Sequence, residues 1–429
     1  MAYQYKELNL YFTNEEGNQL VPEARQVYYN GNTPIEKVIV EQLLRGPGES
    51  GHYATLPSDT RIVGVSVADG IAYVNLGKQF VDEALPVDAQ IPIYKKAGIA
   101  TARYHMVDDL EGCRKFIDEV GYPVVVKPDN GVGASDTHKL SSDEELKRFL
   151  LYKSTYHPDL AYIMEEFVHA EVNSYDAIID GSGNPIFEAG NVSPVSIMDI
   201  VNDNDNSIYY IIKDLPEDTR AAGRAAVKSF GVKSRFVHFE FFRMTEDQAS
   251  MGKKGQIVAL EVNMRPCGGF TPDMINFARS TNVYKIWADM IAFGGTDMPV
   301  GEHYYCPFAG RRDGKNFVYS HEQIMQKYQK NMRMVDRIPE ALSGAMGNQM
   351  YVATFSTREE MEQFYSDVLA VNDPVNAKVQ KELAEVLALG EPTTTALTEK
   401  PNLSPAVKPT TAVTKTPTRA VTKTARKRK

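Results

Sequence analysis

The feature that most constrains this chain is an alternating run at residues 257–269, IVALEVNMRPCGG. Its apolar residues occupy every second position: Val258, Leu260, Val262 and Met264. The polar residues between and after them are Glu261, Asn263 and Arg265. A period of two is typical of a β-strand with one apolar face and one polar face. Pro266 is expected to end this strand, and the two glycines after it allow close backbone approach.

The polar face of this predicted strand carries groups that suit a nucleotide and its metal ion. Glu261 and Asn263 supply hard oxygen ligands, and one or two carboxylates commonly link Mg²⁺ to nucleotide phosphates. Arg265 can hold a phosphate or a carboxylate through two parallel hydrogen bonds. Taken alone, the same strand can also be a solvated face whose charges pair with neighbouring residues.

A second alternating segment, residues 235–242 (RFVHFEFF), repeats this arrangement. His238 and Glu240 take its polar positions, and Glu240 becomes a further carboxylate ligand if the two strands are neighbours. The intervening residues 245–255 are polar and contain glycine, as expected for a surface connection. Two such strands predict a nucleotide–metal site.

Length and cysteine content set the broad class of the protein. A chain of 429 residues is too long for one core and is expected to form two or three domains. Its three scattered cysteines are too few for a disulfide framework or a zinc site, which favours a reducing compartment. The sequence shows no signal-peptide pattern and no run approaching the ~20 apolar residues that span a bilayer. We therefore expect a cytoplasmic protein with no membrane partner.

Charge is unevenly distributed along the chain. All eight charged residues from Pro401 onward are basic, so the overall net charge of −9 leaves −17 for the rest. Such an acidic body does not resemble a nucleic-acid-binding domain. Residues 373–429 are predicted to be a linker and a disordered basic tail, rich in Pro, Thr, Ala and Lys. The tail either contacts nucleic acid or acidic surfaces weakly, or only adds solubility.

The N-terminal residues predict a small α+β module. Its expected elements are strands at 7–12 and 25–29, a capped helix at 33–45, and a hairpin at 61–76 around Asp69-Gly70. This stretch is similar to the GerM-type domain of sporulation and germination proteins over roughly residues 5–93. We assign residues 1–93 to it. That family has no known catalytic residues, and no cluster of nucleophile, base or metal ligands is visible here.

A lysine followed by a glycine-rich loop suggests a phosphate site in the next part of the chain. Residues 122–127 (YPVVVK) predict a buried strand that ends at Lys127. The following loop contains Gly131, Gly133 and Ser135, whose backbone N–H groups can bind phosphates while the lysine supplies charge. Because the lysine precedes the glycines, this is not a Walker A motif.

Four segments occur in the order used by the ATP-grasp superfamily: GYPVVVKPDNGVGAS, YIMEEFV, VHFEFF and LEVNMRPCGG. Residues 94–300 therefore resemble an ATP-grasp domain, most nearly that of carboxylate–amine ligases and more distantly biotin carboxylase. The resemblance implies an α+β fold in which two subdomains clamp ATP. Residues 301–372 are expected to form a C-terminal α+β segment that completes this region, as a lid or a wall of the cleft.

The resemblance assigns the nucleotide contacts residue by residue. Lys127 matches the phosphate-contacting lysine, and the loop with Gly131, Gly133 and Ser135 matches the phosphate lid. The hinge that contacts adenine corresponds to four consecutive residues, Glu165, Glu166, Phe167 and Val168. Glu171 stands one place before the usual ribose-binding glutamate, which would fall at Val172. We assign Glu171 as the ribose contact.

The same resemblance assigns the metal ligands and the reactive centre. Glu240, Glu261 and Asn263 match the ligands of Mg²⁺, for which Mn²⁺ is an alternative ion. Arg265 matches the residue beside the transferred phosphate or acyl group. Arg311 and Arg312, further along, either reach an anionic substrate or are solvated surface arginines.

The resemblance implies an ATP-dependent ligase that activates a small-molecule carboxylate as an acyl phosphate for attack by an amine or another nucleophile. Two departures affect this expectation. The GerM-type module replaces the usual N-terminal Rossmann-like domain, and Val87 stands where a basic residue is expected, which should weaken ATP binding. The alternative is therefore an ATP-binding or scaffolding protein with little or no turnover. Whether the protein forms a homo-oligomer is left open.

Overall fold

The computed structural model describes residues 3–15, 20–68, 71–80, 85–130, 136–194 and 206–372. The expectations for Gly131, Gly133 and Ser135, for the Asp69-Gly70 turn and for the tail at 373–429 lie outside these residues. Within them, no helix has the length and apolar character needed to cross a membrane.

The N-terminal residues form two antiparallel hairpins and a helix, as the sequence predicts. β1 (Tyr3–Thr13) pairs with β2 (Leu20–Asn30), and β3 (Ile62–Ala68) pairs with β4 (Ile71–Leu76). Helix α1 (Ile35–Leu44) contributes Val38 to a small apolar core, and the short helix η1 (Lys78–Phe80) follows the second hairpin. The other buried members of that core are Leu8, Leu10, Phe12 and Val27.

A four-stranded sheet with two helices on one face forms the smaller of the two remaining layers. Its strands, in spatial order, are β6 (Tyr104–Met106), β9 (Tyr162–Glu166), β7 (Val124–Pro128) and β8 (His138–Leu140). Helices α3 (Leu110–Val120) and α4 (Asp143–Tyr156) begin at capping residues Asp109 and Ser142. Val124 and Val126 pack against these helices, so the alternation of β7 turns Lys127 to the opposite face.

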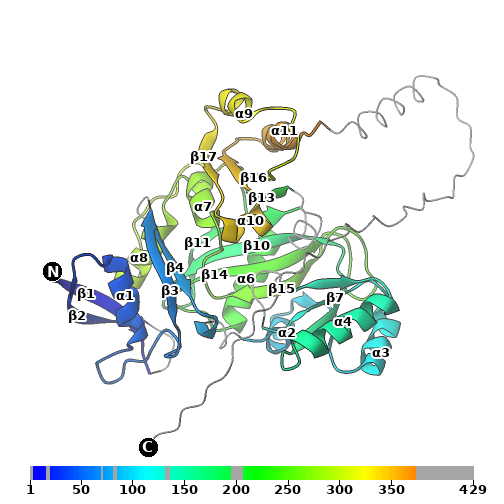
Figure 1. Ribbon diagram of the computed structural model, residues 1–429, viewed down its shortest axis with the longest axis horizontal. Helices are drawn as coiled ribbons and strands as arrows, with labels where there is room; N and C mark the ends of the chain where they lie inside the picture. Colours follow the sequence, from blue (N-terminus) through cyan, green and yellow to red (C-terminus); the bar gives the residue numbers. More distant parts are fainter. Residues whose placement is uncertain are drawn as a thin grey trace, which may run out of the picture. The chain divides into compact units, whose positions relative to one another are not determined.

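A ten-stranded sheet forms the larger layer, with β10, β14 and β15 side by side in it (Figure 1). Its strands, in chain order, are β5 (Ala100–Thr101), β10 (Ala170–Ile179), β11 (Pro185–Ala189), β12 (Asn191–Ser193), β13 (Ser207–Ile211), β14 (Arg235–Met244), β15 (Ile257–Asn263), β16 (Cys306–Arg311), β17 (Met332–Arg337) and β18 (Gln349–Ala353). β16, β17 and β18 belong to the segment 301–372. That segment therefore extends the sheet that carries β14 and β15.

Helices cover both faces of the larger sheet. One face packs against α2 (Val87–Lys96), α6 (Glu217–Ser229), α9 (His321–Lys327) and α11 (Arg358–Leu369). The other face packs against α7 (Thr271–Arg279), α8 (Val283–Phe293) and α10 (Glu340–Met346). His238 and Glu240 of β14 lie on this second face, with Glu261 and Asn263 of β15 opposite them.

Two expectations from the sequence are corrected by the fold. β15 ends at Asn263, whose partner His238 is the last in the β14–β15 register, so Arg265 lies in the segment leading to α7. The interpretation of Arg311 and Arg312 as solvated surface residues is wrong, because both are buried. Arg311 donates from Nε to the Val368 carbonyl at 2.6 Å, and Arg312 donates from Nη2 to a carbonyl of α10. These arginines satisfy backbone groups near the ends of α11 and α10.

Candidate active site

Antiparallel pairing of β14 and β15 brings the two predicted carboxylate ligands together. Glu240 lies directly opposite Glu261, and His238 lies opposite Asn263. Residues that are directly opposite in an antiparallel pair share a face, with their Cβ atoms about 4.5–5.5 Å apart. The register thus gathers four polar side chains on one face of the larger sheet.

A buried chain of hydrogen bonds fixes the orientation of Glu240. His238 Nδ1 lies 2.8 Å from Asp176 Oδ1 on β10, and His238 Nε2 lies 2.9 Å from Glu240 Oε1. The second oxygen of Asp176 accepts a hydrogen bond from the Ser174 hydroxyl and a longer one, 3.4 Å, from Asn191 Nδ2. Because Asp176 is fully buried, the carboxylate of Glu240 is tied to the interior of the sheet.

The two carboxylates have opposite pKa shifts. Burial, and then the charge of Glu240, raise the pKa of Glu261 to about 7. Burial alone would raise the pKa of Glu240, but the hydrogen bond and charge of His238, followed by Arg265 and Lys127, hold it below its usual value. Two adjacent carboxylates beside an amide oxygen supply the hard oxygen donors that Mg²⁺ prefers. The residues present therefore fit Mg²⁺.

Lys127 and Glu165 meet on the face of the smaller sheet that is turned away from α3 and α4. Lys127 Nζ lies 2.6 Å from Glu165 Oε2, and both side chains are mostly buried. Lys127 also lies near enough to Glu240 and Glu261 for its positive charge to favour the ionised form of each. It opposes the raised pKa of Glu261 and contributes to the lowered pKa of Glu240. Arg265 is exposed and acts on the same two carboxylates, so both predicted cations accompany the carboxylate pair.

The expected adenine hinge is held by a loop that the sequence did not single out. Glu166 pairs with Arg103, with Nε to Oε2 at 2.8 Å, and it also accepts from Ser250. Gln248 donates from Nε2 to the Phe167 carbonyl at 3.0 Å, and its Oε1 accepts the N–H of the residue after Val168 at 2.8 Å. The polar stretch 245–255 is thus more than a surface connection.

Among the described residues, the Val168 N–H has no hydrogen-bond partner, while the carbonyl before it is taken by Gln248. A free N–H of this kind suits the acceptor edge of an adenine ring. Arg103 binds both oxygens of the Glu166 carboxylate. The hinge can therefore contact a ligand through its backbone and not through this carboxylate.

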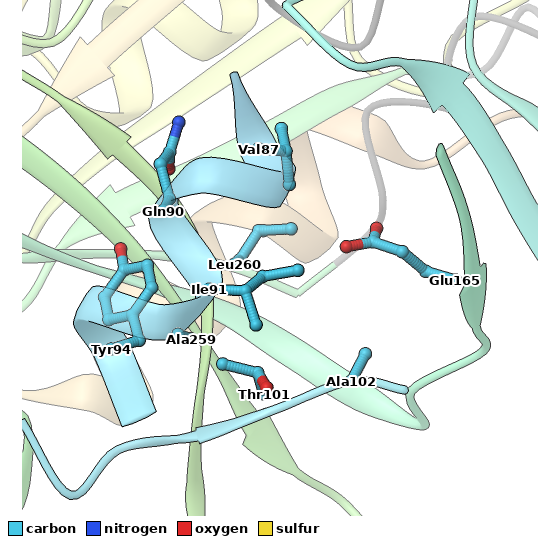
Figure 2. A pocket seen from close by; sticks show the side chains of 9 residues that line it. All are labelled: Val87, Gln90, Ile91, Tyr94, Thr101, Ala102, Glu165, Ala259 and Leu260. Atoms are coloured by element: carbon cyan, nitrogen blue, oxygen red, sulfur yellow. The ribbon is translucent and has the colours of Figure 1, made fainter. Parts of the chain in front are cut away.

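Helix α2 supports the edge of β15 beside the carboxylates. Gln90 Oε1 accepts the Val262 N–H at 3.1 Å, which satisfies a backbone group that β5 does not reach. Figure 2 shows Gln90 and Tyr94 of α2, Leu260 of β15 and Glu165 around a small pocket. Its volume of about 10 Å³ is room for one water molecule. Gln90 therefore helps to hold Glu261 in register.

Two sequence assignments do not join this cluster. Glu171 pairs with Arg243 on β14, one residue out of phase with Ser174 and Asp176, so it lies on the opposite face of the sheet from Glu240. Val172 takes the position in phase with the carboxylates, and the ribose role of Glu171 stays a prediction that this placement does not favour. Val87 is buried in an apolar cluster with Ile91 and Ile163, as befits a residue without charge.

Four further residues take part in the site, and the sequence gives a signal for only one of them. His238 shares the alternation of Glu240, so its face was predictable although its hydrogen bonds were not. Asp176, Gln248 and Arg103 stand in no recognisable motif, and no local pattern distinguishes them. Each becomes part of the site through a contact with a distant segment.

Comparison with known proteins finds similarity to one domain family and to several ligases. The family model described as "Germane: Sporulation and spore germination" matches residues 9–94. D-alanine–D-alanine ligase of Acetivibrio thermocellus is 30% identical over 237 residues, covering 50% of this chain and 57% of that protein. The carbamoyl phosphate synthase large chain, N-terminal section, of Methanopyrus kandleri is 26% identical over 179 residues, covering 38% and 31%. An L-amino acid ligase structure from Bacillus licheniformis has a TM-score of 0.50 at 16% identity, covering 69% and 74%.

These findings confirm that the chain has ATP-grasp ligases of the carboxylate–amine type as homologues, and that it has the α+β ATP-grasp fold. The GerM-type resemblance is likewise confirmed as a Germane domain at residues 9–94. The chain spans 57% of the D-alanine–D-alanine ligase and 31% of the synthase section.

Proposed function

We propose that this protein is an ATP- and Mg²⁺-dependent ligase that joins a small-molecule carboxylate to an amine. The observation that carries the proposal is the carboxylate pair Glu240 and Glu261, opposed on neighbouring strands and flanked by Lys127 and Arg265. This arrangement suits a triphosphate, because the cations bind phosphate oxygens and the carboxylates bind the accompanying metal. ATP-dependent ligation by the homologues supports the same reaction class.

In the proposed reaction, an oxygen of the substrate carboxylate attacks the γ-phosphorus of ATP, and ADP leaves. The amine then attacks the carbonyl carbon of the acyl phosphate, inorganic phosphate leaves, and the nitrogen loses a proton to give the amide. Mg²⁺ held by Glu240, Glu261 and Asn263 would neutralise charge on the phosphates. Lys127 exchanges Glu165 for a phosphate oxygen, and Arg265 stabilises charge on the transferred group.

The remaining assignments follow the same proposal. The backbone of residues 165–168 contacts the adenine, residues 94–300 hold the nucleotide, and residues 301–372 complete the sheet and the acceptor side. Residues 1–93 form an appended module whose only contribution to the site, among the described residues, is the start of helix α2, where Gln90 supports β15, and residues 373–429 are the basic tail. Neither Glu240 nor Glu261 acts as a covalent nucleophile, because positioning and electrostatics suffice for this chemistry.

ADP release tests the proposal. The full chain is incubated with ATP and Mg²⁺, and then with pairs of candidate acids and amines, beginning with D- and L-amino acids. These are chosen first because the names of two similar proteins specify amino acid ligation. We expect ADP release that depends on both an acid and an amine and that is lost in Asn263→Ala. Nucleotide binding without ADP release across the panel would favour the alternative of an ATP-binding protein with little turnover.

A further inference from the structure

A second group of potential metal-ligating side chains adjoins Glu240 of the carboxylate pair. It consists of Asp176 on β10, His238 on β14 and Cys267 in the segment between β15 and α7, and one ligand atom from each lies within 4.8 Å of the others. Asp176 and His238 are buried, whereas Cys267 is partly exposed. Access for an ion is therefore from the side of Cys267. Cys267 has no role in the proposed ligase reaction.

We propose that Asp176, His238 and Cys267 bind a transition metal ion of the Zn²⁺ class. Thiolate, imidazole and carboxylate are the three ligand types that zinc uses, and three protein ligands leave a fourth position open. Mg²⁺ prefers oxygen donors and does not select a thiolate, so this site is chemically distinct from the carboxylate pair. The ligands come from two paired strands and a short segment that a third strand anchors, which limits their movement.

The groups around the cluster already have the arrangement that metal ligands need. His238 Nδ1 lies 2.8 Å from Asp176 Oδ1, a separation that a proton bridges. The ion would replace that proton and the proton of the Cys267 thiol, both of which pass to solvent. His238 would keep its other N–H on Glu240, at 2.9 Å, and a carboxylate on the second nitrogen is the usual support for a metal-bound histidine.

The other grouping of this kind among the described residues is a poorer match. It contains His105, Asp108 and Cys113, near the start of α3. Asp108 has a side chain that is 55% exposed, and burial raises the pKa of the Cys113 thiol to about 11. A buried thiol that resists ionisation and a largely exposed carboxylate make weak ligands. This cluster instead supplies an internal control.

Cobalt(II) is the probe, because it replaces zinc and gives an intense ultraviolet charge-transfer band only when a thiolate binds it. The full chain is titrated with Co²⁺ under reducing conditions and without nucleotide, so the outcome does not depend on the proposed ligase activity. We expect one equivalent of Co²⁺ to produce the band and Zn²⁺ to abolish it. Co²⁺ bound only to the oxygen ligands of the carboxylate pair would give no such band.

Single replacements of the three cysteines decide the assignment. Cys267→Ser and Cys267→Ala should abolish the band and weaken Co²⁺ binding at least tenfold, whereas Cys113→Ser and Cys306→Ser should retain both. Cys306 is a suitable match because it is buried in β16 and belongs to neither cluster. The proposal is overturned if the natural chain shows no band, if the band persists in both folded Cys267 variants, or if Cys113→Ser removes it.

Discussion

Replacing Glu261 by glutamine tests how much free energy the carboxylate pair costs the metal-free protein. The folded-state pKa of Glu261 is about 7, against an ordinary value of 4.5. Each pKa unit corresponds to about 1.4 kcal/mol, so ionising this side chain in the fold costs up to about 3 kcal/mol. Because the folded pKa is raised, stability is fully present below about pH 4.5 and is lost as the pH rises through about 7.

Glutamine has the same shape and cannot ionise, so Glu261→Gln should remove this cost. At pH 8 and without Mg²⁺, the variant should unfold at a higher temperature than the natural chain. For a domain of about 200 residues or more, a change of about 3 kcal/mol in unfolding free energy shifts the melting temperature by roughly 6–12 °C. At pH 5 the difference should fall to about 1 kcal/mol, because Glu261 is then protonated in the folded chain and only partly protonated in the unfolded chain, where its pKa is near 4.5.

Glu240→Gln is a matched control in which the sign should reverse. His238 holds the pKa of Glu240 below its usual value against the effect of burial, so the ionised form of Glu240 stabilises the fold. Losing its charge-assisted hydrogen bond should cost about 1.5–3 kcal/mol at pH 8. The removed repulsion offsets only part of this cost, because burial rather than the charge of Glu240 is the larger cause of the raised pKa of Glu261. Two identical substitutions on paired residues should thus shift the melting temperature in opposite directions.

Thermal melts of the full chain at pH 5 and pH 8, with a chelator or with Mg²⁺, measure these shifts. Mg²⁺ should raise the melting temperature of the natural chain at pH 8, and this rise should be much smaller in both glutamine variants. The reasoning is refuted if Glu261→Gln lowers the melting temperature at pH 8, or if its effect is the same at both pH values.

Two further predictions concern other parts of the fold. Lys127→Met should weaken ATP binding at least tenfold in isothermal titration, because it removes the cation that Glu165 now holds; an unchanged affinity would exclude a phosphate role. Gly223→Ala in α6 should lower the unfolding free energy by about 1–3 kcal/mol, because its Cβ would lie 2.2 Å from the buried ring of Tyr175. Gly344→Ala in α10, where nothing lies within 4 Å, should be neutral or slightly stabilising, and equal melting shifts for the two would contradict the packing argument.

The sequence predicted the two strands of the carboxylate pair because their information is local. A period of two fixes which residues of β14 and β15 share a face, and the order of the motifs suggested that these strands are neighbours. It did not predict where β15 ends. The alternation of apolar and polar residues continues to Arg265, but pairing with β14 stops at Asn263, opposite His238. It placed Glu171 by proximity to a motif position, but a shift of one residue moves a strand side chain to the other face.

The contacts around His238 show why the rest of the site was out of reach. His238 and Asp176 are 62 residues apart and meet because β10 and β14 pair in one register. A slip of that register by one residue would turn Asp176 away and leave a buried imidazole with one partner instead of two. Local alternation therefore predicts which way each side chain points, whereas its partners depend on the relative register of two strands. Cys267 depends on one condition more, because it follows the end of β15 and its position is set by the path of the chain into α7.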